Sequence, residues 1–222
     1  MGSVIYTLFI AIFIPILLMA MLVEKKARLP ILFMLVGIFM SVFAAEINGA
    51  FSKYLTMSSY DIMVTVTPIT EELVKALPIL YYAIVISDKR EKLFTASMAT
   101  GIGFAVLENA YYLLSYSSNF SMLNAVIRAF GAGLMHGMCT LLVGVGIFFV
   151  KRKRKLFAVG TFGLLSTAIV YHGIYNILIQ SEYSTAGALL PIATYVPFFI
   201  WRWRIKHQQG NAAKKQESCP TP

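Results

Sequence analysis

Three charged residues, Glu71, Glu72 and Lys75, interrupt the otherwise largely apolar stretch 62–87. A charged side chain near the centre of a bilayer costs about 2.5–3.5 kcal/mol on insertion scales, so such groups face a protein interior or a water-filled cavity. On a helix, Lys75 lies one turn from both glutamates and can neutralise one of them. The other carboxylate is left without a counter-ion. A pair of adjacent carboxylates suits the proton exchange that a general base performs near neutral pH.

The composition predicts a polytopic membrane protein. The chain has 222 residues, of which 58% are hydrophobic and only 13% charged, and its mean hydropathy is +0.72, which is too apolar for a soluble domain. The first apolar stretch, 5–23, lacks a preceding basic flank and a following small-residue cleavage site, so we expect it to remain as a helix. The formal charge of +9 comes from short basic clusters, which indicate topology and not a nucleic-acid surface. Cys139 and Cys219 are placed too differently to suggest a disulfide or a metal cluster.

Apolar stretches long enough to cross a bilayer predict an all-α bundle of about seven transmembrane helices. Basic clusters follow the first, third, fifth and seventh stretches and hold 16 of the 19 lysines and arginines. Since such clusters stay in the cytoplasm, the N-terminus is expected outside and the C-terminus inside. We expect one helical domain over 1–204 and a basic, disordered cytoplasmic tail over 205–222. The expected stretches are 3–23, 30–50, 62–87, 93–115, 122–150, 155–180 and 185–204.

Further polar residues lie within these stretches and are expected to meet at one depth. At about 1.5 Å per residue, they fall in the outer half of the bilayer or near its middle. His172 and Asn176 are four apart and share a helical face. Residues from four helices therefore converge on one predicted site, namely Glu71, Glu72, Glu108, His136, His172 and Asn176, with Lys75, Asn109 and Arg128 in support.

The chemistry of this set leaves two mechanisms open. Glu108, His136 and His172 are candidate ligands for a divalent metal such as zinc, with another glutamate as general base. Alternatively, no metal takes part. A glutamate and a histidine then deprotonate water, while the second histidine and Asn176 donate hydrogen bonds to an oxyanion. The zinc-protease motif H-E-x-x-H does not occur in the sequence.

Four motifs in order make the chain resemble PrsW, a bacterial membrane protease. Its relatives are the CAAX prenyl endopeptidases and bacteriocin-processing proteins of the glutamate-type intramembrane protease group. The resemblance runs from the third to the sixth apolar stretch. The motifs are Glu71-Glu72-x-x-Lys75, Phe104-Ala-x-x-Glu108-Asn109, Arg128 eight residues before His136, and His172-Gly-x-Tyr175-Asn176.

The resemblance implies an intramembrane endopeptidase of the bacterial plasma membrane. Glu71 and Glu72 would supply the essential carboxylates, Glu108 and His136 would lie in the site, and His172 would be essential. It does not decide whether Glu71 or Glu72 is the base. The implied substrate is a single-span, anti-sigma-factor-like protein, and a first cut near its extracytoplasmic end would release a stress-response regulator.

Several of these residues also have structural interpretations. Arg128 is expected to snorkel to the membrane surface or to pair with a carboxylate such as Glu46. Asn109 is expected to bond a neighbouring helix. A group of glycines, Gly131, Gly133 and Gly137, is expected to permit close helix packing.

Two other functions compete with the protease. A proton- or ion-coupled transporter also buries glutamates and histidines at mid-membrane, although 222 residues without a detectable repeat leave little room for alternating access. A noncatalytic receptor or assembly factor would tolerate substitution of both glutamates and both histidines.

Overall fold

The computed structural model describes residues 2–87, 89–115, 122–152 and 157–217, and this part of the chain is helical without a strand. The expected all-α class is therefore confirmed. The expected loop 116–121 and part of the basic cluster 151–155 lie outside the described residues. The α-helices are α1 (Gly2–Leu22), α2 (Lys25–Tyr54), α3 (Ser59–Asp61), α4 (Thr67–Tyr81), α5 (Arg90–Ser115), α6 (Met122–Arg152), α7 (Gly163–Ile179) and α8 (Ser184–Glu217).

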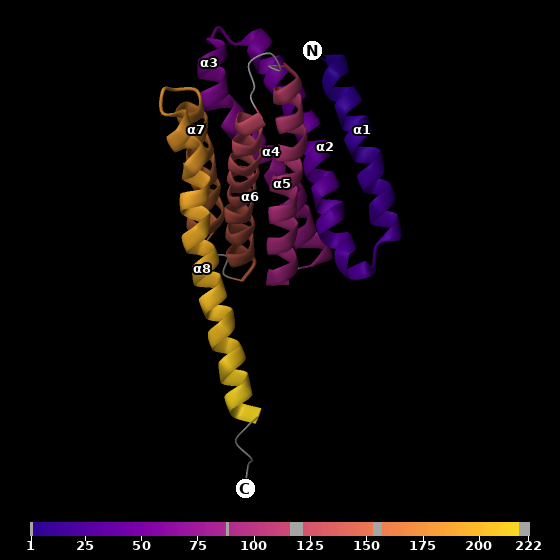
Figure 1. Cartoon of the computed structure of the whole chain (residues 1–222), viewed down its shortest axis with the longest axis vertical. Coiled ribbons are helices and arrows are strands. Elements are labelled where there is room, and N and C mark those ends of the chain that lie inside the picture. Colours follow the sequence, from indigo (N-terminus) through magenta and orange to yellow (C-terminus); the bar gives the residue numbers. More distant parts are fainter. Residues whose placement is uncertain (1, 88, 116–121, 153–156, 218–222) are drawn as a thin grey trace.

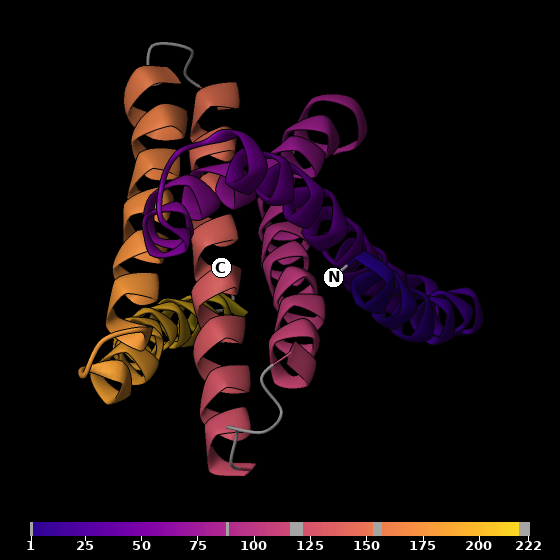
Figure 2. The same cartoon turned by 90° about the horizontal axis from the view of Figure 1, so that it is seen from above.

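The long helices run side by side in a bundle, with α1 at one edge and α7 and α8 at the other (Figure 1). Seen from above, α5 and α6 stand in the middle, and α1 and α2 extend away to one side (Figure 2). The C-terminal part of α8 projects beyond the bundle and remains helical to Glu217. A separate tail beginning at residue 205 remains a prediction.

Among the described residues, four helices are long and apolar enough to cross a membrane: Val4–Leu22, Lys25–Tyr54, Ala125–Val150 and Gly160–Ile179. The other stretches expected to span, 62–87, 93–115 and 185–204, are largely helical where the structure describes them. The chain is accordingly a helical membrane protein with four candidate spans. The count of seven spans and their orientation stay predictions.

The short helix α4 is flanked on both sides by wider π-helical turns, at Ile62–Val66 and Tyr82–Ile86. Two prolines, Pro68 in its first turn and Pro78 inside it, cannot donate backbone hydrogen bonds. Single π-helical turns are frequent at functional sites. This irregular segment packs between α2, α6 and α7. It carries the three charged residues Glu71, Glu72 and Lys75.

Glycines bring α2, α5 and α6 into backbone contact. A Cβ at Gly37 of α2 would overlap the carbonyl oxygen of Thr100 on α5, and one at Gly103 would overlap that of Met34 on α2. On the other side of α5, a Cβ at Gly101 would overlap the carbonyl group of His136 on α6. Small residues let membrane helices approach this closely. The backbone of His136 is thus fixed against α5.

Candidate active site

All three charged residues of α4 are buried in the protein. The side chains of Glu72 and Lys75 have no exposed surface, and Glu71 is 6% exposed. The apolar residues Ile69, Leu73 and Leu77 on the same helix are exposed. The helix therefore turns its apolar side outward and its charged side into the bundle, as the cost of a charge in lipid requires.

Lys75 neutralises Glu72 and not Glu71. Its ammonium nitrogen Nζ lies 2.6 Å from Glu72 Oε1, and it also lies 2.8 Å from His136 Nδ1. The same nitrogen stands over the ring of Phe104, 4.6 Å from the centroid, where a cation is attracted to the aromatic face. Lys75 therefore joins residues of α4, α5 and α6.

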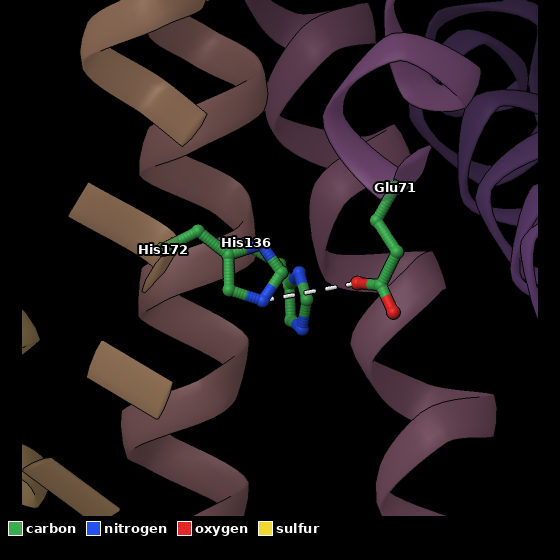
Figure 3. A group of neighbouring side chains, drawn as sticks. All are labelled: Glu71, His136 and His172. Atoms are coloured by element: carbon green, nitrogen blue, oxygen red, sulfur yellow. Dashed lines mark ion pairs between the residues drawn. The ribbon is translucent and has the colours of Figure 1, made fainter. Parts of the chain in front are cut away.

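His172 on α7 is held by Glu72. Its Nδ1 lies 2.8 Å from Glu72 Oε1, the oxygen that also receives the Lys75 ammonium. An ionised carboxylate only accepts hydrogen bonds, so Nδ1 carries the hydrogen and donates it. In the neutral ring, Nε2 then has the free lone pair. This Nε2 faces Glu71, whose Oε2 lies 3.8 Å away (Figure 3).

His136 on α6 has the opposite hydrogen pattern. Its Nδ1 faces the Lys75 ammonium, which can only donate, so Nδ1 is the acceptor. Its Nε2 therefore carries the hydrogen and donates it to Glu108 Oε2, at 2.5 Å. The rings of His136 and His172 meet edge to face, with centroids 4.9 Å apart.

Glu108 on α5 lies at the open side of the cluster, with 20% of its side chain exposed. Its Oε1 pairs with Arg128 Nη2 at 3.5 Å, and the Arg128 guanidinium stands 3.9 Å from the centre of the Tyr112 ring. Arg128 thus pairs with a carboxylate, as expected, but the partner is Glu108. The example given from the sequence, Glu46, instead accepts a hydrogen bond from Tyr6 in α1 at 2.7 Å.

The two asparagines lie beside the cluster. Asn176 is one turn from His172, and its amide donates to the carbonyl oxygen of Met63 at 3.0 Å, in the first π-helical turn. The hydrogen bonds of the described residues do not join Asn176 to either histidine. Asn109, next to Glu108, is 9% exposed, and its Oδ1 has no hydrogen-bond partner within the described residues.

Glu71, His136 and His172 are close enough together to suggest a metal site (Figure 3). One candidate ligand atom from each lies within 4.8 Å of the others. The sequence suggested Glu108 as the carboxylate ligand. In the structure this group contains Glu71, while Glu108 is engaged by His136 and Arg128.

The hydrogen bonds test whether a metal fits these residues. A metal takes a nitrogen lone pair, and the other ring nitrogen then almost always donates to an acceptor. His172 meets this condition, with Nε2 free and Nδ1 donating to Glu72. His136 does not, because its Nδ1 lone pair is taken by the Lys75 ammonium. Ligation through Nε2 would instead break the hydrogen bond to Glu108 and turn an Nδ1 hydrogen toward that ammonium. Catalytic zinc needs three protein ligands, so the three residues as arranged do not fit one.

Two contacts of the cluster were not found from the sequence. Phe104 occurs in one of the motifs, but its spacing gave no sign that it lies under the Lys75 ammonium. The Met63 carbonyl that binds Asn176 is a backbone group, and only the π-helical turn makes it available. A backbone carbonyl of this kind leaves no pattern in the sequence.

Comparison with known proteins gives one family. The family model described as PrsW family intramembrane metalloprotease matches residues 25–202, which is most of the chain. Protease PrsW of Clostridioides difficile (strain 630) is 28% identical over 221 residues, covering 89% of this chain and 87% of that protein. No solved structure matches.

Proposed function

We propose that this chain, which belongs to the PrsW family of intramembrane metalloproteases, cuts a membrane-anchored protein with water held between Glu71 and His172. The family consists of peptide-bond hydrolases, so the chain is an enzyme and not a transporter or a noncatalytic receptor. The roles of individual residues and the nature of the substrate are what we add.

The observation that carries this proposal is that two hydrogen-bond acceptors face each other. Glu71 Oε2 lies 3.8 Å from His172 Nε2, which is too far for a direct hydrogen bond. Both are acceptors when Glu71 is ionised and His172 is neutral. Glu71 Oε2 is buried, with no hydrogen-bond partner in the described part of the chain. A water molecule has two hydrogens and can satisfy both acceptors at once.

This arrangement assigns different roles to the two glutamates. Glu71 takes a proton from the water, whose oxygen attacks the peptide carbonyl carbon, and the proton then passes to the leaving nitrogen as the C–N bond breaks. Glu72 holds Nδ1 of His172 and so keeps Nε2 turned toward the water. Glu71 is thus the proposed general base, and Glu72 is a positioning residue.

The oxyanion formed during attack needs a hydrogen-bond donor. His136 Nε2 carries a hydrogen that is held by Glu108, the partly exposed residue at the open side. We propose that the substrate carbonyl replaces Glu108 as its acceptor. Asn176 was the other expected donor, but its amide is bound to Met63, so we propose that it fixes the turn beside His172.

The family description includes a metal. A bound divalent ion such as zinc supplies a Lewis acid and eases the deprotonation of water. Because the hydrogen bonds of His136 do not fit ligation, we propose that Glu71 and His172 activate the water without a metal at His136.

The membrane arrangement that we propose has seven spans in a bacterial plasma membrane. The N-terminus lies outside, and the tail 205–222 lies in the cytoplasm. Support comes from the 16 of 19 basic residues that this arrangement puts on one side. The proposed substrate is a single-span, anti-sigma-factor-like protein, cut in the outer half of the bilayer.

The test is cleavage of a panel of single-span substrates by the purified protein in detergent. We expect Glu71→Gln and His172→Ala to lower the cleavage rate by about 10²–10⁴-fold, the usual contribution of a general base. Glu46→Gln, the same change in a glutamate outside the cluster, should leave the rate unchanged. Cleavage that survives both cluster substitutions would show that the active site lies elsewhere.

Chelation tests the metal separately. Without a metal at His136, we expect cleavage to persist after dialysis against a strong chelator, in protein whose metal content has been measured. Loss of cleavage on chelation, with recovery on adding zinc, would contradict the proposed water activation and favour the metal mechanism.

A further inference from the structure

The Lys75 ammonium is buried among three groups that attract it, namely two hydrogen-bond acceptors and one aromatic face. They are Glu72 Oε1 at 2.6 Å, His136 Nδ1 at 2.8 Å and the face of Phe104, whose centroid is 4.6 Å away. The side chain has no exposed surface, so these groups take the place of water. One cation therefore touches one histidine directly and reaches the other through a single carboxylate oxygen.

We infer that Lys75 is a positioning residue that sets opposite tautomers on the two histidines. Its ammonium forces His136 Nδ1 to accept, which leaves the hydrogen on Nε2. The same ammonium compensates Glu72 in its ionised form, so Oε1 accepts from His172 Nδ1 and the His172 lone pair stays on Nε2. On both rings Nε2 is the nitrogen that faces away from Lys75, with a hydrogen on His136 and a lone pair on His172.

This pattern matters because the proposed reaction needs both forms. His172 Nε2 must accept a hydrogen from water, and His136 Nε2 must donate one to the oxyanion. A buried imidazole with the wrong tautomer can lower kcat by as much as about 10⁴-fold. The catalytic consequence rests on the proposed function, but the tautomers do not and can be measured without substrate.

Lysine suits this position better than other basic or polar residues. Arginine would bring a planar group of five donors to a place with no exposed surface. Methionine fills a similar volume without donors or charge. Lys75→Met therefore removes the control of the tautomers with a small change in shape. Lys53→Met is the matched control, because Lys53 lies at the exposed end of α2 with its ammonium over the Tyr54 ring.

The measurement is ¹⁵N NMR of the imidazoles in the full-length protein labelled at histidine. The chain has only three histidines, and His136→Gln and His172→Gln assign two of the three signals. At a pH where the rings are neutral, we expect His136 to appear as the Nε2–H tautomer and His172 as the Nδ1–H tautomer. Finding the same tautomer on both rings in the wild type would overturn the inference.

Variants of Lys75 then test whether this residue sets the tautomers. We expect Lys75→Met to change the His136 signals to a mixture of tautomers, because Glu108 still accepts from Nε2 but no ammonium then keeps a hydrogen off Nδ1. We expect cleavage to fall by about 10²-fold or more. Lys53→Met should alter neither. If Lys75→Met does not fold, the double variant Glu72→Gln with Lys75→Met removes both buried charges together and is read in its place. Unchanged tautomers in the folded variant would show that Lys75 does not set them, even if Glu71→Gln abolishes cleavage.

Discussion

Helices α1 and α4 show two ways in which a helix of this protein meets the membrane. α1 contains no charged residue, and its apolar window is only 11% buried, so most of its surface faces outward. α4 buries two glutamates and a lysine. α1 is long and apolar enough to count as a candidate span, whereas α4 has only 15 residues and is too short to count as one. In this bundle, the helix without charges lies at the edge, and the helix that carries the buried charges holds the candidate site.

Of the substitutions that compare α4 with α1, we expect the one at Glu72 to lower the stability of the fold most. Glu72→Gln leaves the Lys75 ammonium buried without its counter-ion, and breaking a buried pair in this way typically costs about 3–5 kcal/mol. We expect a clear fall in the thermal unfolding temperature in detergent, together with loss of cleavage. The same change at Glu46, beside α1, should leave the unfolding temperature nearly unchanged.

The double variant sharpens this prediction. Adding Lys75→Met to Glu72→Gln removes the unpaired charge, and we expect much of the lost thermal stability to return. Cleavage should not return, because His172 Nδ1 would lose its carboxylate acceptor and His136 Nδ1 would lose the ammonium beside it. If the single Glu72→Gln variant is as stable as the wild type, the ion pair does not compensate Lys75 as described.

A smaller effect is expected where α5 touches α6. A Cβ at Gly101 would overlap the backbone of His136, whereas one at Gly133, three residues before His136, meets nothing within 4 Å. Gly101→Ala should push α5 away from α6, destabilise the fold by about 1–3 kcal/mol and slow cleavage by shifting His136 from Lys75. Gly133→Ala is the control, for which we expect no loss. Equal behaviour of the two variants would mean that the close approach does not position His136.

The sequence was sufficient to predict those features of the site that depend on spacing along a single helix. The burial of the charges on α4, and the capacity of Lys75 to neutralise one glutamate a turn away, follow from position along one helix. Which glutamate pairs with Lys75 and His172 depends on how α4 is rotated against α6 and α7. That rotation is set by packing between residues 61 and 100 positions apart in the chain.

The same limit explains the other differences. Depth in the membrane follows from counting residues, so the sequence could predict one level for Glu108, His136 and His172. Which of them touch is decided by side-chain direction around each helix axis. For this reason Glu71 replaced Glu108 in the group that suggested a metal, and Asn176 bound a backbone carbonyl. Helix packing through small residues, which fixes these directions, is visible in the sequence only as scattered glycines.

The smallest effect should come from α1 itself. Tyr6→Phe removes the hydrogen bond from the Tyr6 hydroxyl to Glu46 Oε1, and such bonds between membrane helices contribute about 0.6 kcal/mol on average. We expect a slight fall in thermal stability and an unchanged cleavage rate, because this bond lies outside the cluster around Lys75. A marked loss of cleavage at full stability would mean that α1 acts on the substrate or on the site, and the contrast between the edge helix and α4 would then be wrong.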